Sequence, residues 1–151
     1  MSIESKGILK TYSTLTKEEK NFVLDLFNTN NNPLISDNKI IQYFSLINSK
    51  YFFLYSNDKK LIGGVNINKI LNNVFINFLY VKKDFIRMGF GNKLIEYVLN
   101  KYCQNNIYFE LNTDNNRYKA QFNFYKEYGF IFNKHIGNSN ILFLKEKSEH
   151  C

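Results

Sequence analysis

The sequence predicts a single mixed α+β domain over residues 1–151, with a central, mixed, mostly antiparallel sheet of about six to seven strands and about four helices. Hydrophobic residues make up 44% of the chain, which suits one compact core. Apolar residues recur with a helical period in some segments and form strand-like runs in others. The resulting order, β-α-α-β-β-β-α-β-α-β-β, puts hairpins first and β-α-β crossovers later, unlike a doubly wound fold.

Two helices are expected after the first strand, at about residues 16–27 and 37–47. Thr16 and Glu19 have the spacing of a capping box, which marks a helix N-terminus. The positions expected to face the core are Phe22, Val23, Leu26 and Phe27 in the first helix and Ile40, Ile41, Phe44 and Ile47 in the second. The loop at 28–33 contains the only proline and separates the two helices.

Strands follow at about residues 51–55, 61–67 and 74–81. The turn signal Ser56-Asn57-Asp58 makes the first two a hairpin. Residues 74–81 are almost continuously apolar, which is typical of a central strand covered on both faces.

The second half of the chain alternates helices and strands. Gly129 is a candidate C-cap for the last helix, because glycine adopts the left-handed conformation that ends many helices. The expected elements are a helix at 91–104, a strand at 107–111, a helix at 116–128, and closing strands at 130–134 and 141–144.

The formal net charge of +7 indicates a partner or ligand that carries negative charge. A nucleotide cofactor, a nucleic acid and an anionic lipid all fit that description. No secretory signal and no apolar run of membrane-spanning length is recognisable, so we expect a soluble, intracellular, cytoplasmic protein.

The two cysteines, Cys103 and Cys151, belong to no CxxC pair, so we expect neither a disulfide framework nor a zinc site. His135 and His150 are far apart and have no acidic or cysteine partner nearby in sequence. We therefore expect no metal.

A basic, glycine-containing turn joins the apolar strand at 74–81 to the next helix. Gly89 and Gly91 allow a sharp turn and a close approach of ligand to backbone. The helix begins at once, so its free N–H groups and positive dipole end can bind a pyrophosphate. The charged residues that flank the turn are Lys82, Lys83, Arg87 and Lys93, opposed by Asp84. The alternative is a connection that merely turns the corner.

Two motifs in chain order resemble those of the GCN5-related N-acetyltransferases. Leu79-Tyr80-Val81 with Gly89-Phe90-Gly91 and Leu94 is similar to motif A, and Phe124-Tyr125-Lys126-Glu127-Tyr128-Gly129-Phe130 is similar to the end of motif B. Leu61-Ile62-Gly63-Gly64 resembles the strand that precedes the central one, so the likeness covers about residues 60–130. Two positions depart from the pattern: Ile86 replaces a Gln or Arg, and Tyr118 replaces an Asn.

This resemblance implies that acetyl-CoA is the co-substrate and that its acetyl group passes directly to a primary amine. In the family, a bulge splays the central strand from its neighbour and frees backbone groups that bind the pantetheine arm. The implied cofactor-binding residues are Leu79, Tyr80 and Val81 on the strand, Arg87, Met88, Gly89, Phe90, Gly91, Asn92 and Lys93 at the turn, and Asn116 further on.

The resemblance also places Tyr125 beside the sulfur, where its phenol would protonate the leaving thiolate. The alternative is that Tyr125 only packs in the core. The expected central strand has no carboxylate, so Glu110 on the next strand is the candidate base, acting through a water, with Asp114 as a second choice. Glu110 could instead be a solvated strand residue, and Asp114 could be a turn residue or a helix N-cap. Because proximity alone lowers barriers, a missing base would not exclude activity.

Three functions remain open at this point. The first is an acetyl-CoA-dependent N-acetyltransferase; the second is a catalytically silent acyl-CoA-binding or sensor domain of the same fold. The third is a small basic RNA-binding module, which ranks last because the aromatic residues follow core periods. The expected acceptor is a small-molecule, protein or peptide amine. We expect no nucleic-acid or membrane partner, and a homodimer stays open.

Overall fold

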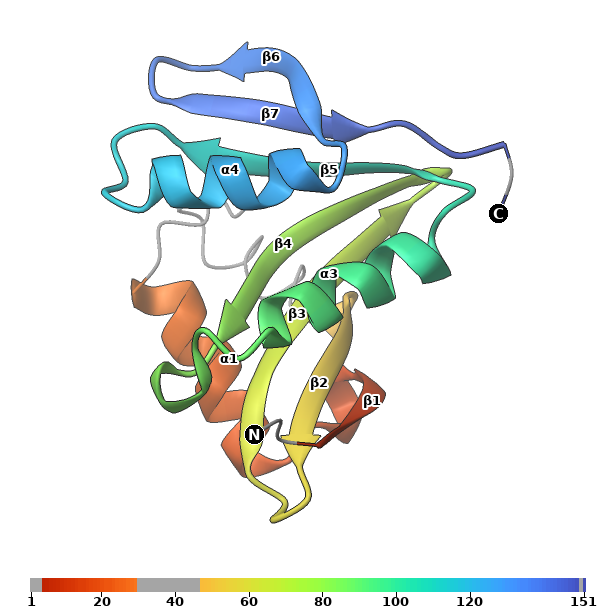
Figure 1. Cartoon of the computed structure of the whole chain (residues 1–151). Coiled ribbons are helices and arrows are strands. Elements are labelled where there is room, and N and C mark those ends of the chain that lie inside the picture. Colours follow the sequence, from red (N-terminus) through yellow and green to blue (C-terminus); the bar gives the residue numbers. More distant parts are fainter. Residues whose placement is uncertain (1–3, 30–46, 150) are drawn as a thin grey trace.

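The computed structural model describes residues 4–29, 47–149 and 151, which form one seven-stranded sheet and three α-helices (Figure 1). The strand order is β1-β2-β3-β4-β5-β7-β6. The strands are β1 (Ser5–Thr11), β2 (Lys50–Ser56), β3 (Leu61–Ile70), β4 (Asn73–Val81), β5 (Asn106–Asn112), β6 (Ile131–Ile136) and β7 (Asn140–Lys145). The β4–β5 pair is parallel and the other neighbouring pairs are antiparallel, which confirms the predicted mixed, mostly antiparallel sheet.

The described helices cover both faces of the sheet. They are α1 (Lys17–Thr29), α3 (Phe90–Lys101) and α4 (Tyr118–Glu127). Helix α1 packs on one face, and α3 and α4 pack on the other (Figure 1). Helix α3 is the crossover between the parallel strands β4 and β5. The predicted helix at 37–47 lies outside the described residues except at its last position. None of the described helices is long and apolar enough to cross a membrane.

Strand β3 extends three residues beyond its predicted end, α3 ends three residues before its predicted end, and α4, expected from Asn116, begins at Tyr118. The side-chain oxygen of Asn115 accepts the amide N–H of Arg117 at 2.8 Å. The Tyr118 N–H donates to the Asn115 carbonyl at 3.0 Å, three residues back and not four, so residues 115–118 form a turn before the helix. After α4, Gly129 has a φ of 92°, as expected of the predicted C-cap.

Two hydrophobic clusters fill the two faces. The larger lies beneath α3 and α4 and includes the buried side chains of Ile76, Leu94 and Phe109. The smaller lies beneath α1, whose predicted inward residues Phe22, Val23 and Leu26 are buried, as are Tyr51, Phe53 and Leu61 from the sheet. The sheet separates the two clusters. Because successive side chains of a strand point to opposite faces, each strand residue faces either α1 or the side of α3 and α4.

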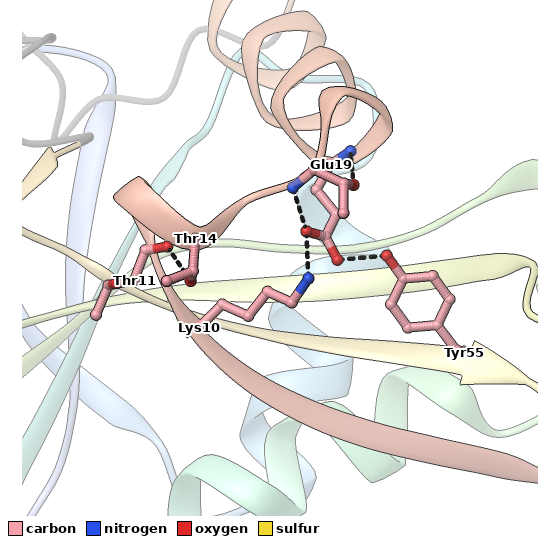
Figure 2. A network of polar contacts seen from close by, with 6 residues as sticks. Lys10, Thr11, Thr14, Glu19 and Tyr55 are labelled. Carbon is pink, nitrogen blue, oxygen red and sulfur yellow. Dashed lines mark hydrogen bonds and ion pairs between the residues drawn. The ribbon is translucent and has the colours of Figure 1, made fainter.

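Helix α1 is fastened to the sheet by the carboxylate of Glu19, which is fully buried (Figure 2). One oxygen accepts the Thr16 amide N–H at 2.8 Å and the Lys10 ammonium at 2.7 Å, and the other accepts the Tyr55 hydroxyl. The Thr16 hydroxyl accepts the Glu19 amide N–H at 3.2 Å, which completes the predicted capping box. Burial raises the pKa of Glu19, but the hydrogen bonds from Lys10, Tyr55 and Thr16 outweigh it and leave that pKa below its ordinary value.

The end of the chain is joined to the end of α3 by a disulfide between Cys103 and Cys151, so the expectation of no disulfide is wrong. Their Cα atoms are 6.0 Å apart, and 48 residues separate them in sequence. The tail continues from β7 past the start of β5, where the Lys147 N–H donates to the Asn106 side chain at 2.9 Å and the Ser148 N–H donates to the Cys103 carbonyl at 2.8 Å. The sequence positions of the two cysteines could not predict that they meet, because their proximity depends on the path of β7.

Candidate functional site

Strand β4 contains an extra residue at Asn77. Its neighbours Ile76 and Phe78 pair with the consecutive β3 residues Ile67 and Asn66, so Asn77 is the bulged position. The Asn77 side-chain amide donates to the Asn66 side-chain oxygen at 2.7 Å, and both residues are buried. A bulge bends its strand and increases the local twist. It therefore turns the second half of β4 away from β5.

Beyond the bulge, β4 and β5 separate. Their parallel pairing ends at Ile76 and Phe109, while β4 continues to Val81 and β5 to Asn112. Figure 1 shows the two strands close at one end of β4 and apart at the other. We call this opening the split, and the pair at its closed end the vertex. The far half of β4 thus has a sheet partner on the β3 side alone.

The backbone of β4 offers hydrogen-bonding groups to the split. The Lys82 N–H donates to the Ile62 carbonyl of β3 at 2.7 Å. Because direction alternates along an antiparallel ladder, the backbone groups of Tyr80 also point to β3, and those of Leu79 and Val81 point into the split. Of the three predicted strand residues, Leu79 and Val81 therefore present backbone groups to the split. The Tyr80 side chain instead packs on the α1 side, against Phe22.

The turn after β4 ends in two left-handed residues around Met88. Arg87 has a φ of 64° and Gly89 a φ of 84°. A left-handed arginine is strained, and such strain concentrates at functional sites. The first helical hydrogen bond runs from the Lys93 N–H to the Gly89 carbonyl at 3.2 Å. The N–H groups of residues 90–92 therefore have no partner within the helix and face the turn.

Several side chains at this turn already have partners within the protein, so a ligand here would contact mainly backbone groups. Phe90 is buried in the core, the Asn92 oxygen accepts the Tyr128 hydroxyl at 2.8 Å, and the Lys93 ammonium contacts the Ser5 hydroxyl at 3.1 Å. Ile86, at the position that is Gln or Arg in the family pattern, is half exposed, as is Met88.

Tyr125 of α4 lies against the closed end of the split. Its ring stacks on Phe109 with centroids 3.7 Å apart, and the side chain is only 8% exposed. Burial raises the pKa of Tyr125, so the phenol stays protonated at any physiological pH. The larger hydrophobic cluster also contains this residue, so the alternative of core packing is observed, and the site role stays a prediction.

Glu110 is the first β5 residue beyond the last β4–β5 pair. Phe109 faces α4, so alternation turns Glu110 to the α1 face of the sheet. Its Oε2 atom is buried and has no hydrogen-bond partner among the described residues. Burial raises the pKa of Glu110. A desolvated carboxylate at the vertex is a suitable proton acceptor.

The other predicted residues lie further away along the chain. Asn116 and Asp114 are exposed in the turn between β5 and α4, and the Asp114 N–H donates to the Asn112 side chain at 2.7 Å. The structure therefore brings Tyr125 and Glu110 to the vertex and leaves Asn116 outside it. In the described part of the chain, no three metal-ligating side chains gather. The sequence had suggested a bulge by family likeness, but the Asn66–Asn77 pair could be found only from the strand register.

A cleft of about 410 Å³ opens on the α1 side, beside the residue that follows β4. It is lined by Lys17, Glu18, Asn21, Phe22, Asp25 and Lys82. The Lys82 ammonium lies 5.8 Å from the centre of the Phe22 ring. The cleft thus borders the open end of the split with groups of both charges.

Comparison with known proteins gives one family and one fold. Residues 17–130 match the model of the acetyltransferase (GNAT) family. No curated protein sequence matches the chain. A Bacillus subtilis acetyltransferase in complex with CoA superposes with a TM-score of 0.70 at 16% identity, over 95% of this chain and 99% of that chain. A GNAT family acetyltransferase from Elizabethkingia anophelis, with acetyl-CoA bound, gives 0.67 at 16% identity, over 94% and 97%. An acyl-CoA N-acyltransferase from Pseudomonas aeruginosa gives 0.68 at 14% identity, over 94% and 99%.

Proposed function

Because this chain belongs to the acetyltransferase (GNAT) family, we propose that it is an acetyl-CoA-dependent N-acetyltransferase that transfers the acetyl group directly to a primary amine. The observation that carries the proposal is the split between β4 and β5. At its open end lies the N-terminus of α3, and at its closed end lie Tyr125 and Glu110, on opposite faces of the sheet. A long, bent ligand with an anionic end and a reactive end fits this arrangement.

The residues present fit coenzyme A. The free N–H groups of residues 90–92 suit its pyrophosphate, and the charges of Lys83 and Arg87 lie on the same turn. The backbone groups of Leu79 and Val81 suit the amides of the pantetheine arm. When bound, acetyl-CoA supplies an acetyl group activated as a thioester. Support comes from the Bacillus subtilis and Elizabethkingia anophelis proteins of the same fold, which were solved with CoA and acetyl-CoA.

Two side chains would move or hold protons. Glu110 would accept one proton from the acceptor ammonium, directly or through a water, because its raised pKa makes it more basic than an ordinary glutamate. Its position on the α1 face supports approach of the amine from that side. The amine nitrogen forms the new C–N bond as the C–S bond breaks, and its second proton ends on the departing thiol.

Tyr125 would act on the other face of the sheet. Its protonated phenol would donate to the departing sulfur. It is a better hydrogen-bond donor than proton donor, because a raised pKa makes the phenol reluctant to ionise. The acceptor is a small-molecule or peptide amine that reaches Glu110 from the α1 face.

The test is release of free thiol from acetyl-CoA by the purified chain. The panel contains amino acids, a diamine, a polyamine and peptides with a free N-terminus, with the corresponding N-acetylated compounds as controls. We expect thiol release with at least one free amine and none with its acetylated form. Tight acetyl-CoA binding without turnover on any amine would favour the silent acyl-CoA-binding alternative. Absence of binding as well would refute both.

A further inference from the structure

Two buried oxygen atoms in the described part of the chain lack a hydrogen-bond partner: Glu110 Oε2 and Asn140 Oδ1. Buried polar atoms in folded proteins are nearly always paired, and each exception calls for an explanation. Both atoms are acceptors, so a single kind of missing partner, a hydrogen-bond donor, satisfies both.

The strand register places these two residues side by side. Glu110 of β5 pairs with Leu142 of β7, and Asn112 pairs with Asn140. Glu110 and Asn140 are therefore diagonal neighbours, with backbones about 7–8 Å apart. The neighbours Phe109 and Phe143 belong to the cluster beneath α3 and α4, so alternation turns Glu110 and Asn140 to the same face, the α1 face.

A primary ammonium group fits between these acceptors better than other donors do. It carries three N–H donors and a positive charge, as a lysine side chain does. One N–H can reach the Glu110 carboxylate and a second can reach the Asn140 carbonyl. A hydroxyl group has one hydrogen and no charge, and a tertiary ammonium has one N–H. Lys134 of β6 lies opposite Leu142 and is exposed. The ion pair found among the described residues involves Glu19 and not Glu110.

We propose that Asn140 is the second half of the acceptor site: Glu110 Oε2 and Asn140 Oδ1 together hold the acceptor's primary ammonium on the α1 face of the vertex. This inference rests on the proposed function and adds to it the residue that selects primary amines over alcohols and tertiary amines. Asn140 carries no charge and takes no proton, so it acts in binding, whereas Glu110 acts in both binding and proton transfer.

These different roles predict different kinetic effects for substitutions of Asn140 and Glu110. Asn140→Ala should raise KM for n-butylamine about tenfold, the effect of losing one hydrogen bond to a charged group, and leave kcat within about twofold. Glu110→Gln should lower kcat as well. The matched control is Asn133→Ala, which removes the same side chain from an exposed position on β6 and should change neither constant. Asn140→Ser and a melting temperature for each variant separate a binding defect from a folding defect.

A second readout does not depend on turnover. In the protein with CoA bound, n-butylammonium should shift the side-chain amide resonances of Asn140, identified by their loss in Asn140→Ala, and n-butanol should not. If the wild type releases thiol but Asn140→Ala has the KM of the control variant, the inference is overturned while the proposed function stands. If no amine releases thiol, the proposed function fails, and the resonance titration alone decides whether an ammonium binds here. Equal shifts with n-butanol would refute the ammonium site.

Discussion

The ring of Tyr125 stacks on the ring of Phe109, with centroids 3.7 Å apart and planes inclined by 26°. This contact brings a phenol to one face of the sheet at the vertex, while the next residue of β5, Glu110, faces the other. In the proposed function, the hydrogen-bond donor to the leaving sulfur and the base for the attacking amine would thus lie on opposite faces of the sheet. The proposed direct transfer needs two separately placed groups, because the nucleophile and the leaving group are different substituents of the tetrahedral acetyl carbon.

Tyr125→Phe should lower kcat about 10- to 100-fold, because it removes the donor to the sulfur. The stacked ring remains, and the hydroxyl makes no hydrogen bond within the described part of the chain, so the melting temperature should change by less than about 2 °C. Steady-state thiol release and a thermal melt measure the two quantities. An unchanged kcat would show that Tyr125 serves the core alone.

Glu110→Gln should remove the acid limb of the pH–rate profile. In the wild type, kcat/KM should fall as pH drops through the Glu110 pKa, which burial has raised above its ordinary value. The variant should be less active and flat over the same range. The measurement is kcat/KM between pH 5 and about 9. A wild-type profile without that limb would exclude Glu110 as the base.

The same substitution should stabilise the fold near neutral pH. A carboxyl with a raised folded-state pKa contributes stability below its unfolded pKa and loses it as pH rises through the folded pKa. Once ionised, the partly desolvated Glu110 therefore disfavours the fold. Glu110→Gln should raise the melting temperature by about 2 °C or more at pH 7, with a smaller difference near pH 4. A fall at pH 7 would show an unrecognised partner for this carboxylate.

Gly91→Ala should stabilise the protein and weaken coenzyme A binding. A Cβ added at Gly91 meets only the Phe124 ring, at an ordinary 3.7 Å, and alanine favours a helix by about 0.5–1 kcal/mol. The added methyl would nevertheless stand where the backbone approaches the pyrophosphate. We expect a higher melting temperature and a CoA dissociation constant raised about tenfold or more, by calorimetry.

Gly89→Ala is the contrasting variant at this turn. An added Cβ there meets nothing within 4 Å, but the φ of 84° disfavours any side chain. It should lower the melting temperature, whereas Gly91→Ala raises it. Undiminished CoA affinity in Gly91→Ala would place the pyrophosphate elsewhere.

The strand, turn and helix of this site could be predicted from sequence because they depend on local signals. A continuous apolar run marked β4, and Gly89 and Gly91 marked the turn. The capping box of Thr16 and Glu19 was likewise local. The contacts of Glu19 with Lys10 and Tyr55 were not predictable, because they join elements that meet only in the folded sheet.

Asn140 was missed for a different reason. Asparagine is so frequent in this chain that no single one stood out. Its proposed role follows from the strand register, which sets it diagonal to Glu110 on one face. The alternation of side chains along β7 could have indicated the face of the sheet to which Asn140 points. The pairing of β5 with β7 could be known only from the tertiary structure.

Glu19→Gln should destabilise the fold by about 3 kcal/mol, the effect of removing one partner from a buried ion pair. The pKa of Glu19 is lowered, so its contribution is present above the unfolded pKa and is lost as pH falls through the folded pKa, below 4.5. The variant's deficit should therefore shrink in acid. Urea unfolding at pH 7 and pH 3 measures it, with the exposed neighbour substitution Glu18→Gln as the control. Equal stability of both variants would contradict the network.

Cys151→Ser should lower stability by about 2–4 kcal/mol, because the disulfide closes a long loop of the unfolded chain. A reducing agent should lower the melting temperature of the wild type and leave the variant unchanged. Mass spectrometry of the unreduced protein should find the linked peptides. Two free thiols in the protein purified under oxidising conditions would refute the bond.

The most direct test of the central claim is a crystal structure with acetyl-CoA bound. The pyrophosphate should contact the N–H groups of residues 90–92, and the pantetheine arm should lie in the split along Leu79 and Val81. The thioester should then end at the vertex, between Tyr125 and Glu110. Absence of the ligand from this turn at saturating concentration, or its binding elsewhere, would contradict the account.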